Sequence, residues 1–476
     1  MMDFIGFFVV LFVLVATVAY WWGGHTKSKS DSKRKEGKAV TAEGKEDISH
    51  SSAHAQSRNN NKDKNVPKRN QQQSSKSSTS AKPTDQRFLR RFGGHTGAIE
   101  SMAVSPDGEW IATAGIDGLI RVSKINTQNE SNNTNLYLQT KVKNPELGFL
   151  KDYASILSWL PDGRTIVCTI HKSRDIAFYR IRRKKEPEDQ SKQSSASVFP
   201  YELIELSKRR FHTSLDRGID FKACLADLSH PNSCLLFTNS TTTTELHTTV
   251  AWDGMKGEAL GNFLTRGGGV RLSPDGRFLC ARSLGGPPLA TELKIYEVQR
   301  NKVKGQVEPV FDKISSKSVM TVIPKGSRMR DVTFCATTTA EGPITNSLMC
   351  LGCDDGSIQI WDIDVEYKRR EDPKILCIAT SVLPSRNNKN AKIVRVAASV
   401  VGCVQRIAVA MSDSSLHLLI YSPPSSTKPA TILLEFSIEG TTHPEGISDL
   451  QFCPASANVL YSRGNESRDV FAWTIN

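Results

Sequence analysis

The sequence predicts an all-β fold, a seven-bladed β-propeller, preceded by one N-terminal transmembrane helix and a disordered linker. From position 87 onward, short apolar runs alternate with Gly, Pro and Asp turns, and no helical periodicity of useful length interrupts them. Many short strands separated by frequent turns are typical of sandwiches, barrels and propellers. Internal repeats favour the propeller among these three.

The first repeated feature is a Pro-Asp-Gly tripeptide that directly precedes an apolar run. It occurs in SPDGEWIATAG (105–115), LPDGRTIVCTI (160–170) and SPDGRFLCARS (273–283). Pro presets φ, Asp hydrogen-bonds to its own backbone and Gly accepts a positive φ, so the tripeptide forms a tight turn. We therefore expect a turn followed by a strand in each of these segments.

The second repeated feature is an apolar, often aromatic, third strand that closes each unit. Seven segments fit this description: LIRVSKI (119–125), IAFYRI (176–181), TVAWDG (249–254), LKIYEV (293–298), IQIWDI (358–363), LHLLIY (416–421) and VFAWTI (470–475). Trp252-Asp253 and Trp361-Asp362 are the two literal Trp-Asp pairs among them. This pattern indicates a degenerate WD-repeat β-propeller with seven blades.

Closure of the ring follows from the position of the last unit. Its third strand is the final apolar segment of the chain, so its outer strand must come from elsewhere. RFLRRF (87–92), just before Gly94-His95, is the candidate. Pairing the first strand with the last blade removes the open sheet edges of the ring.

A membrane segment is predicted at Phe4–Trp22, where FIGFFVVLFVLVATVAYWW contains no charge. As a helix it would span about 28 Å, close to the thickness of a bilayer core. A cleaved signal peptide is the alternative, but no Lys or Arg precedes the segment and it ends in Tyr20, Trp21 and Trp22. An aromatic end suits a membrane interface better than a cleavage site. We therefore expect residues 1–24 to form a permanent membrane anchor and not a cleaved signal peptide.

The flanking charges predict the orientation of this anchor. Six Lys and Arg residues lie between positions 27 and 38, and none lies upstream of the apolar segment. The positive-inside rule therefore predicts a lumenal N-terminus and a cytosolic body. The ten cysteines, all beyond position 100, suit a reducing compartment. Glycosylation sequons at Asn129, Asn132, Asn239 and Asn465 would be usable only in the opposite orientation.

Residues 25–86 are predicted to be a disordered basic linker, and 87–476 the propeller. The linker holds fourteen Lys and Arg against seven Asp and Glu, over half of the net charge of +13. Its Lys-, Ser-, Asn- and Gln-rich composition offers almost nothing to bury. Two readings of the charge remain open. The linker either makes nonspecific contact with anionic lipid or RNA, or the charges only solvate it and fix its topology.

Two segments and the N-terminal anchor carry a family resemblance. WDIDVEYKRREDP (361–373) and GGGVRLSPDGRFLCA (267–281) resemble the transducin beta-like protein 2 family of membrane-anchored WD-repeat proteins. The resemblance implies an endoplasmic reticulum protein that associates with an ER-stress kinase and supports translation during the unfolded protein response. The chain departs from the pattern in a Thr-rich run (240–249) and in two segments expected to be long insertions, 126–150 and 182–217.

Several motifs that resemble catalytic or metal sites are better explained as scaffold. The acidic stretch 351–373 lies at successive turn and strand-end positions, and it lacks the glycine and glutamate spacing of an EF-hand. Gly267-Gly268-Gly269 precedes a strand, whereas a phosphate loop precedes a helix. Cys350 and Cys353 form a lone CxxC pair, expected to be buried thiols.

His95 and Asp117 are expected to form a buried hydrogen-bonded link, because no nucleophile is placed beside them. No enzymatic activity, small-molecule substrate, cofactor or metal is therefore predicted.

Basic clusters are the candidate partner-binding residues. Each is either a solvated surface run or a docking site for phosphorylated protein or RNA, and without interleaved aromatic residues any RNA contact would be nonspecific. The candidates are Arg182, Arg183, Lys184, Lys185, Lys368, Arg369 and Arg370, and Lys208-Arg209-Arg210 is a further basic run.

The function predicted from these features is a non-enzymatic, membrane-anchored scaffold for protein–protein interactions. Its expected partners are the ER-stress kinase and the translation machinery. Two alternatives stay open: an ER-anchored guanine-nucleotide exchange factor for a small GTPase, and an electrostatic ribosome or RNA tether. Nucleotide-release assays would identify the first, and a steep salt dependence of binding would identify the second.

Overall fold

The computed structural model describes part of the chain in detail. The chain divides into Met1–Lys76 and Ser77–Asn476, and every described residue lies in the second unit. The predicted anchor (1–24) and nearly all of the linker (25–86) lie outside the described residues. Within the described part, no helix has the length and apolarity needed to cross a membrane. The described residues are 85–125, 137–142, 152–184, 200–210, 220–241, 246–266, 270–283, 292–307, 309–337, 345–380, 382–384, 391–399, 405–438 and 443–475.

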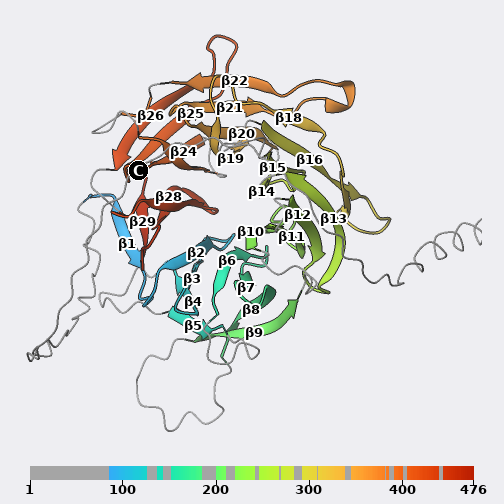
Figure 1. The fold of residues 1–476 in the computed structure, drawn as a ribbon, viewed down its shortest axis with the longest axis vertical. Coiled ribbons are helices and arrows are strands. Elements are labelled where there is room, and N and C mark those ends of the chain that lie inside the picture. The colour runs from blue at the N-terminus through green and yellow to red at the C-terminus, as the bar shows by residue number, and fades with distance from the viewer. Residues whose placement is uncertain are drawn as a thin grey trace, which may run out of the picture. The chain divides into compact units, whose positions relative to one another are not determined.

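Seven antiparallel sheets follow one another around a ring, as the sequence predicts (Figure 1). Blade 1 contains β2 (Ile99–Val104), β3 (Trp110–Gly115), β4 (Leu119–Lys124) and β5 (Tyr137–Lys141). Blade 2 contains β6 (Ala154–Trp159), β7 (Thr165–Ile170), β8 (Asp175–Arg183) and β9 (Tyr201–Arg210). Blade 3 contains β10 (Asp220–Ala226), β11 (Leu235–Thr241), β12 (Leu246–Asp253) and β13 (Glu258–Arg266).

The remaining blades repeat this order, with one extra strand in blade 4. Blade 4 contains β14 (Val270–Leu272), β15 (Phe278–Ser283), β16 (Glu292–Asn301) and β17 (Val310–Ile314), and β18 (Met320–Val322) also pairs with β16. Blade 5 contains β19 (Met329–Thr337), β20 (Thr345–Cys353), β21 (Ile358–Asp362) and β22 (Lys374–Ala379). Blade 6 contains β23 (Ile393–Ala398), β24 (Gln405–Met411), β25 (Leu416–Ser422) and β26 (Thr431–Ile438).

Blade 7 is built from both ends of the folded unit. Its inner strands are β27 (Ile447–Cys453), β28 (Ser456–Gly464) and β29 (Val470–Thr474), and its outer strand is β1 (Phe88–Phe92). β1 pairs antiparallel with β29, with Phe92 opposite Val470. The predicted closing strand is therefore confirmed, and so are all seven predicted third strands, which are β4, β8, β12, β16, β21, β25 and β29.

Burial on both faces explains why the middle strands are continuously apolar. Every residue of β3 (WIATAG) and of β7 (TIVCTI) is buried. A strand with an adjacent blade on each side has no solvent face, so it does not alternate between apolar and polar residues. Outer strands do alternate: β5 buries Leu138 between exposed neighbours. The inner and outer strands of one blade thus follow different sequence rules.

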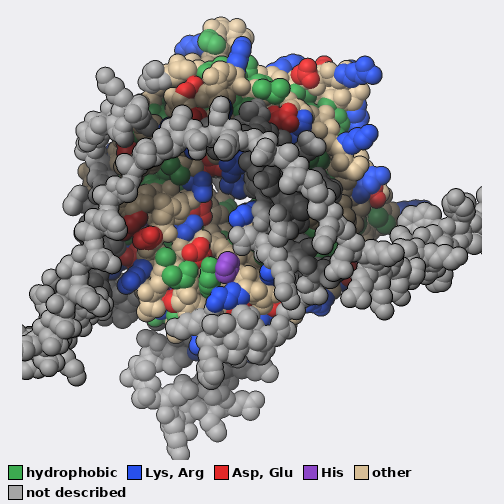
Figure 2. Space-filling view, in the orientation of Figure 1, with side chains coloured by type: hydrophobic (Ala, Val, Ile, Leu, Met, Phe, Trp, Pro, Cys, Tyr) green, Lys and Arg blue, Asp and Glu red, His purple; other side chains and the backbone are tan. Residues whose placement is uncertain are grey.

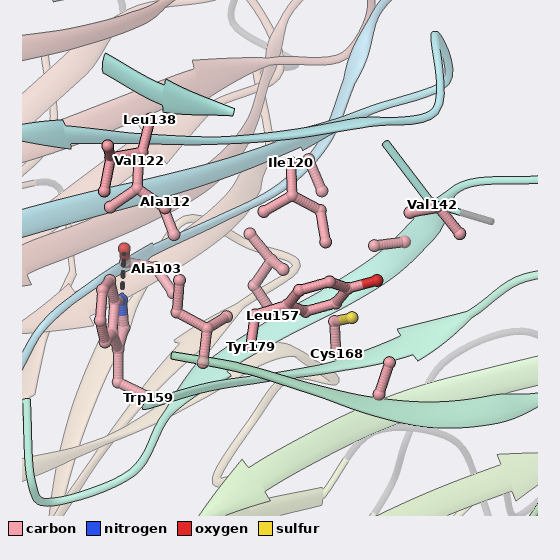
Figure 3. Packing of buried hydrophobic residues seen from close by; sticks show 14 of the residues in the cluster. Ala103, Ala112, Ile120, Val122, Leu138, Val142, Leu157, Trp159, Cys168 and Tyr179 are labelled. Atoms are coloured by element: carbon pink, nitrogen blue, oxygen red, sulfur yellow. Dashed lines mark hydrogen bonds between the residues drawn. The ribbon is translucent and has the colours of Figure 1, made fainter. Parts of the chain in front are cut away.

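The core consists of seven separate apolar layers, each between two adjacent blades. The layer between blades 1 and 2 contains Trp110 and Ile120 from the first blade, and Trp159 and Tyr179 from the second. Figure 3 shows this layer, in which the Trp159 indole N–H donates to the Ala103 carbonyl at 2.9 Å. Every blade therefore depends on both neighbours for its burial.

The Pro-Asp-Gly turns form as predicted. Gly108, Gly163 and Gly276 have φ values of 68°, 61° and 67°, which an L-residue adopts only with strain. In the first turn, Asp107 Oδ1 accepts the Glu109 backbone N–H at 3.0 Å. The three turns connect the innermost strand of a blade to its second strand.

The prediction that segments 126–150 and 182–217 are long insertions is wrong. Segment 126–150 contains β5, and segment 182–217 contains the end of β8 and all of β9. They are therefore the connections to the outer strands of blades 1 and 2, together with those strands. Outer strands are partly exposed and polar, as in YELIELSKRR, so the apolar pattern does not reveal them.

Ring closure generates a stability prediction at Phe88. Its ring meets Phe471 and Trp473 edge-on, with centroids 5.8 Å apart in both pairs. Because Phe88 is half-buried, we expect Phe88→Ala to lower the free energy of unfolding by about 2 kcal/mol, below the ~3–5 kcal/mol of a fully buried Phe. The measurement is urea unfolding followed by tryptophan fluorescence.

The matched control for this prediction is Leu89→Ala. Leu89 lies in the same strand and is 52% exposed. Its replacement should change stability by no more than about 0.5 kcal/mol. Equal effects of the two substitutions would contradict a specific closing role for Phe88.

Candidate partner-binding surfaces

The segment that follows β21 in blade 5 packs against blade 4. It contains a short 3₁₀ turn, η3 (Tyr367–Arg369), and the buried Val365. The Tyr367 hydroxyl donates to the Glu297 carboxylate, and its ring meets Phe278 edge-on at 6.4 Å. Burial and the Glu297 carboxylate raise the pKa of Tyr367, which keeps the hydroxyl protonated. This segment, which carries the family resemblance, therefore links two blades.

Basic candidate residues border a groove beside this turn. The groove has a cavity volume of about 490 Å³, and Lys368 and Arg369 line it together with Glu297. Arg369 pairs with Glu366 at 2.7 Å, but both side chains are largely exposed, so the pair adds little stability. Arg370 is exposed and has a left-handed φ of 65°. These three cations remain accessible to a partner.

The other candidate cluster lies at the end of β8 in blade 2. Arg182 pairs with Glu202 of β9, with guanidinium-to-carboxylate distances of 2.9 and 2.7 Å. Arg183 and Lys184 are exposed, whereas Lys185 lies outside the described residues. Arg182 and Arg183 are thus strand residues and do not belong to an insertion, as the sequence predicts they would.

The additional run on β9 is largely engaged by neighbours. Lys208 pairs with Asp175 at 3.2 Å, and Arg209 donates to the Lys256 carbonyl in blade 3. Blades 2 and 5 are not neighbours in the ring, so the two clusters form two surfaces rather than one.

The acidic stretch at 351–373 is scaffold, as expected. Asp354 accepts hydrogen bonds from Arg330 at 2.7 Å and forms an ion pair with Lys392 at 3.2 Å. Burial acts to raise the pKa of Asp354, but these two cations hold it below its ordinary value. Asp355 instead accepts the Ser357 backbone N–H at 2.9 Å. The acids serve different local bonds, and none of the described residues form a His, Cys, Asp and Glu group fit for a metal ion.

The predicted His95–Asp117 link is confirmed and extends to a third residue. His95 Nδ1 lies 3.0 Å from Asp117 Oδ1, and Nε2 lies 2.9 Å from Thr113 Oγ1. Burial lowers the pKa of His95, although Asp117 opposes this. The neutral imidazole therefore bridges the strand connection before β2 to the turn after β3, which is a structural role.

Blade 7 contains a related link with a tryptophan. His443 Nε2 lies 3.0 Å from Ser462 Oγ, which also accepts the Trp473 indole N–H at 2.9 Å. The His443 ring stacks on Phe471 with centroids 4.6 Å apart. Burial lowers the pKa of His443 to about 4, with a smaller contribution from the charge of Arg463.

Two further sequence expectations concern buried residues. Cys350 and Cys353 are free and fully buried in β20, as expected of core thiols, and burial raises the pKa of Cys353 to about 11.

Asn239 is fully buried and its side-chain amide donates to Thr249 and Thr265 at 2.9 and 3.2 Å. The Asn239 sequon therefore cannot carry a glycan in the folded propeller. The triglycine at 267–269 lies outside the described residues, and a strand, β14, follows it.

Sequence reasoning missed a group of arginines around the central channel. Arg271, Arg282, Arg395 and Arg463 lie near the ends of strands in blades 4, 6 and 7. Isolated arginines at such different chain positions give no local motif. They could be grouped from the sequence only by aligning the seven blades and comparing the residues at corresponding strand ends.

Comparison with known proteins agrees with the fold. A family model described as "WD domain, G-beta repeat" matches residues 86–122, from the start of β1 into β4. Transducin beta-like protein 2 of Homo sapiens is 22% identical over 311 residues, which cover 62% of this chain and 56% of that protein. The chain is similar to transducin beta-like protein 2. The Mus musculus protein of that name is 21% identical over 293 residues, covering 59% of this chain and 53% of the relative.

These comparisons confirm the family resemblance predicted from the sequence. The chain spans about half the length of the curated relatives it matches. A WD-repeat propeller is suited to protein–protein interaction, and it is in general a non-catalytic scaffold.

The inter-blade contact of Tyr367 predicts the behaviour of its basic turn. Tyr367→Ala removes the bond to Glu297 and the contact with Phe278, so the turn should open more often. We expect trypsin to cleave after Lys368, Arg369 or Arg370 roughly tenfold faster, as measured by mass spectrometry of timed digests. Tyr137→Ala, on the outer strand of blade 1, is the matched control. Equal acceleration by both substitutions would contradict a local clamp.

The buried His443 predicts a pH dependence of stability. Its pKa of about 4 in the folded chain lies below the ordinary 6.5 of the unfolded chain. The unfolded state therefore binds the proton first, and lowering the pH from 7 to 5 should remove about 2 kcal/mol of folding stability. The measurement compares urea unfolding of the wild type and His443→Gln at both pH values. An unchanged pH slope in the variant would show that His443 is not responsible.

Proposed function

We propose that this chain is a non-enzymatic, membrane-anchored WD-repeat scaffold with its propeller in the cytosol at the endoplasmic reticulum. The observation that carries the proposal is the position of β1. The predicted linker of residues 25–86 leads directly into the strand that closes the ring, so the anchor would hold the whole propeller and not one peripheral blade. The apolar segment at Phe4–Trp22 and its basic flank support the anchor and its orientation.

The proposed partners are an ER-stress kinase and the translation machinery, in support of translation control during the unfolded protein response. The support is the resemblance to the transducin beta-like protein 2 family at residues 361–373 and 267–281. Confinement to the membrane surface raises the effective concentration of such partners and strengthens weak contacts. The exposed cations Lys368, Arg369 and Arg370 are the proposed docking residues for an acidic or phosphorylated surface.

The orientation is tested by protease protection on intact microsomes with a tag at each end. The C-terminal tag should be digested and the N-terminal tag protected. Because Asn239 is buried, Asn465, which is exposed, is the informative sequon among the described residues. We expect Asn465 to carry no glycan. A protected C-terminal tag together with a glycan on Asn465 would contradict the cytosolic propeller.

The partner is tested by affinity purification from ER-stressed cells. An ER-stress kinase should co-purify with the wild type, and the K368A/R369A/R370A variant should recover roughly tenfold less of it, as expected for the loss of one or two charged contacts. The R182A/R183A/K184A variant in blade 2, which also removes three exposed cations, is the charge-matched control. If both variants recover as much kinase as the wild type, the basic turn is not the docking site. Catalysed nucleotide release from a small GTPase, or binding that falls steeply with salt and survives without the propeller, would favour the two alternatives instead.

A further inference from the structure

Four arginines converge on one end of the central channel, and we call them the arginine mouth: Arg271, Arg282, Arg395 and Arg463. Arg271 and Arg395 lie near the start of β14 and β23, the innermost strands of blades 4 and 6. Arg282 and Arg463 lie near the end of β15 and β28, the second strands of blades 4 and 7. Second strands run antiparallel to innermost strands, so all four positions are at the same end of the ring.

Three members of the arginine mouth donate to a backbone carbonyl of the next blade. Arg282 donates to the Arg330 carbonyl of β19 at 2.6 Å, and Arg395 donates to the Ser448 carbonyl of β27 at 2.7 Å. Arg463 donates to the Ile99 carbonyl of β2. These bonds place guanidinium groups across the seams between blades on the channel wall.

The same bonds leave many donors unused. A guanidinium has five N–H donors in a planar fork, and each of these arginines uses only one or two of them on backbone carbonyls. Within the described residues, Arg463 Nε is buried without a hydrogen-bond acceptor. Arg271 and Arg282 keep 39% and 26% of their side chains exposed. Part of the arginine mouth is therefore open to solvent, and Figure 2 shows Lys and Arg atoms beside Asp and Glu atoms around the hollow at the centre of the ring.

Two carboxylates, Asp331 and Asp449, lie beside the guanidinium groups of the arginine mouth. Asp331 is 1% exposed, and its Oδ1 lies 3.6 Å from Arg271 and 3.9 Å from Arg282. Its Oδ2 accepts the Val396 backbone N–H at 3.0 Å. Asp449 is half-buried beside Arg463 and Arg395, and desolvation raises its pKa although these cations oppose the shift.

Cations outnumber carboxylates among the groups whose charges act on the arginine mouth and in the ion pairs beside it. Burial lowers the pKa of Arg282, Asp331 opposes the shift, and Arg271 and Arg395 add to it by repulsion. With the adjacent ion pairs of Arg330 and Lys392 to Asp354, six cations face four carboxylates, an excess of two positive charges. The ten groups are Arg271, Arg282, Arg330, Lys392, Arg395, Arg463, Glu100, Asp331, Asp354 and Asp449.

We infer that the arginine mouth is a binding site for a phosphate monoester. A phosphate monoester carries about two negative charges and three strong acceptor oxygens. It matches the charge excess, and its oxygens suit the parallel N–H pairs of a guanidinium fork. A single carboxylate would neutralise only half of the excess. The phosphate belongs either to a phosphorylated protein segment or to a soluble phosphorylated molecule. The inference does not depend on the kinase or the membrane orientation proposed above.

A purely structural role for the arginines predicts a different result. If they only link the blades, removing one should lower stability and leave phosphate binding unchanged. Arg271 is the residue that separates the two roles, because its backbone bond is to Val270 in its own strand. The Asp331 carboxylate in blade 5, with which Arg271 pairs at 3.6 Å, also lies 3.9 Å from Arg282, so it keeps one cationic partner when Arg271 is replaced. Arg271→Gln should therefore leave the propeller folded while it removes one guanidinium fork.

The experiment measures binding of the full chain to a fluorescent peptide pool that carries one fixed phosphoserine among random residues. The unphosphorylated pool is the first control. The variants are Arg271→Gln, Arg271→Lys and the control Arg182→Gln, which removes a 58% exposed arginine from blade 2. Inorganic phosphate and inositol hexakisphosphate serve as competitors and as direct ligands, and thermal unfolding of each variant checks the fold.

We expect the phosphorylated pool or inositol hexakisphosphate to bind at least tenfold more tightly than the unphosphorylated pool. Binding should weaken about tenfold in Arg271→Gln, less in Arg271→Lys, and not at all in Arg182→Gln. Preference for the peptide pool identifies a phosphorylated protein as the source, and preference for the inositol phosphate identifies a soluble molecule. The inference is overturned if neither phosphate ligand binds above the unphosphorylated pool, or if Arg182→Gln weakens binding as much as Arg271→Gln in folded protein.

Discussion

The antiparallel pairing of β1 with β29 is the constraint on which the rest of the structure depends. The outer strand of blade 7 comes from the other end of the folded unit, and the Thr474 backbone N–H donates to the Arg87 carbonyl at 2.8 Å. Without it, β29 would be an open sheet edge, and the layer around Phe88, Phe471 and Trp473 would lose one wall. Blades 7 and 1 share the layer that contains Phe92, Ile99 and Tyr461 because the ring returns to its start.

Closure also explains where polar side chains are used inside the molecule. Each seam between blades is an apolar layer, and some polar side chains at the seams donate to backbone carbonyls of the adjacent blade. Trp159 and Arg282 do so in different parts of the ring. The His95–Asp117–Thr113 and His443–Ser462–Trp473 links fix strand ends within single blades. Buried hydrogen bonds of this kind specify one arrangement of the blades.

Much of the fold could be predicted from the sequence because the inner strands carry a strong signal. Third strands such as IQIWDI are buried on both faces and so read as apolar runs, and the Pro-Asp-Gly turns mark the strands that follow them. Outer strands β5 and β9 were missed because a strand with one solvent face is polar at alternate positions and merges with the polar connections around it.

The candidate surfaces were predictable only in part. Lys368 and Arg369 could be found as a basic run, but their attachment to blade 4 through Tyr367 depends on residues about 70 positions away in the chain. The arginine mouth could not be found from local patterns, because Arg271, Arg395 and Arg463 come from three blades and meet only when the ring closes.

The most direct test of this account is hydrogen exchange of the backbone amides in β1 and β29, compared with β28, measured on the native full chain. If β1 closes the ring, its paired amides should exchange with the same opening free energy as the central amides of β28, because the ring opens cooperatively. Exchange of β1 at the rate of an unprotected peptide, while β28 stays protected, would contradict the account. The propeller would then be stable with an open seventh blade.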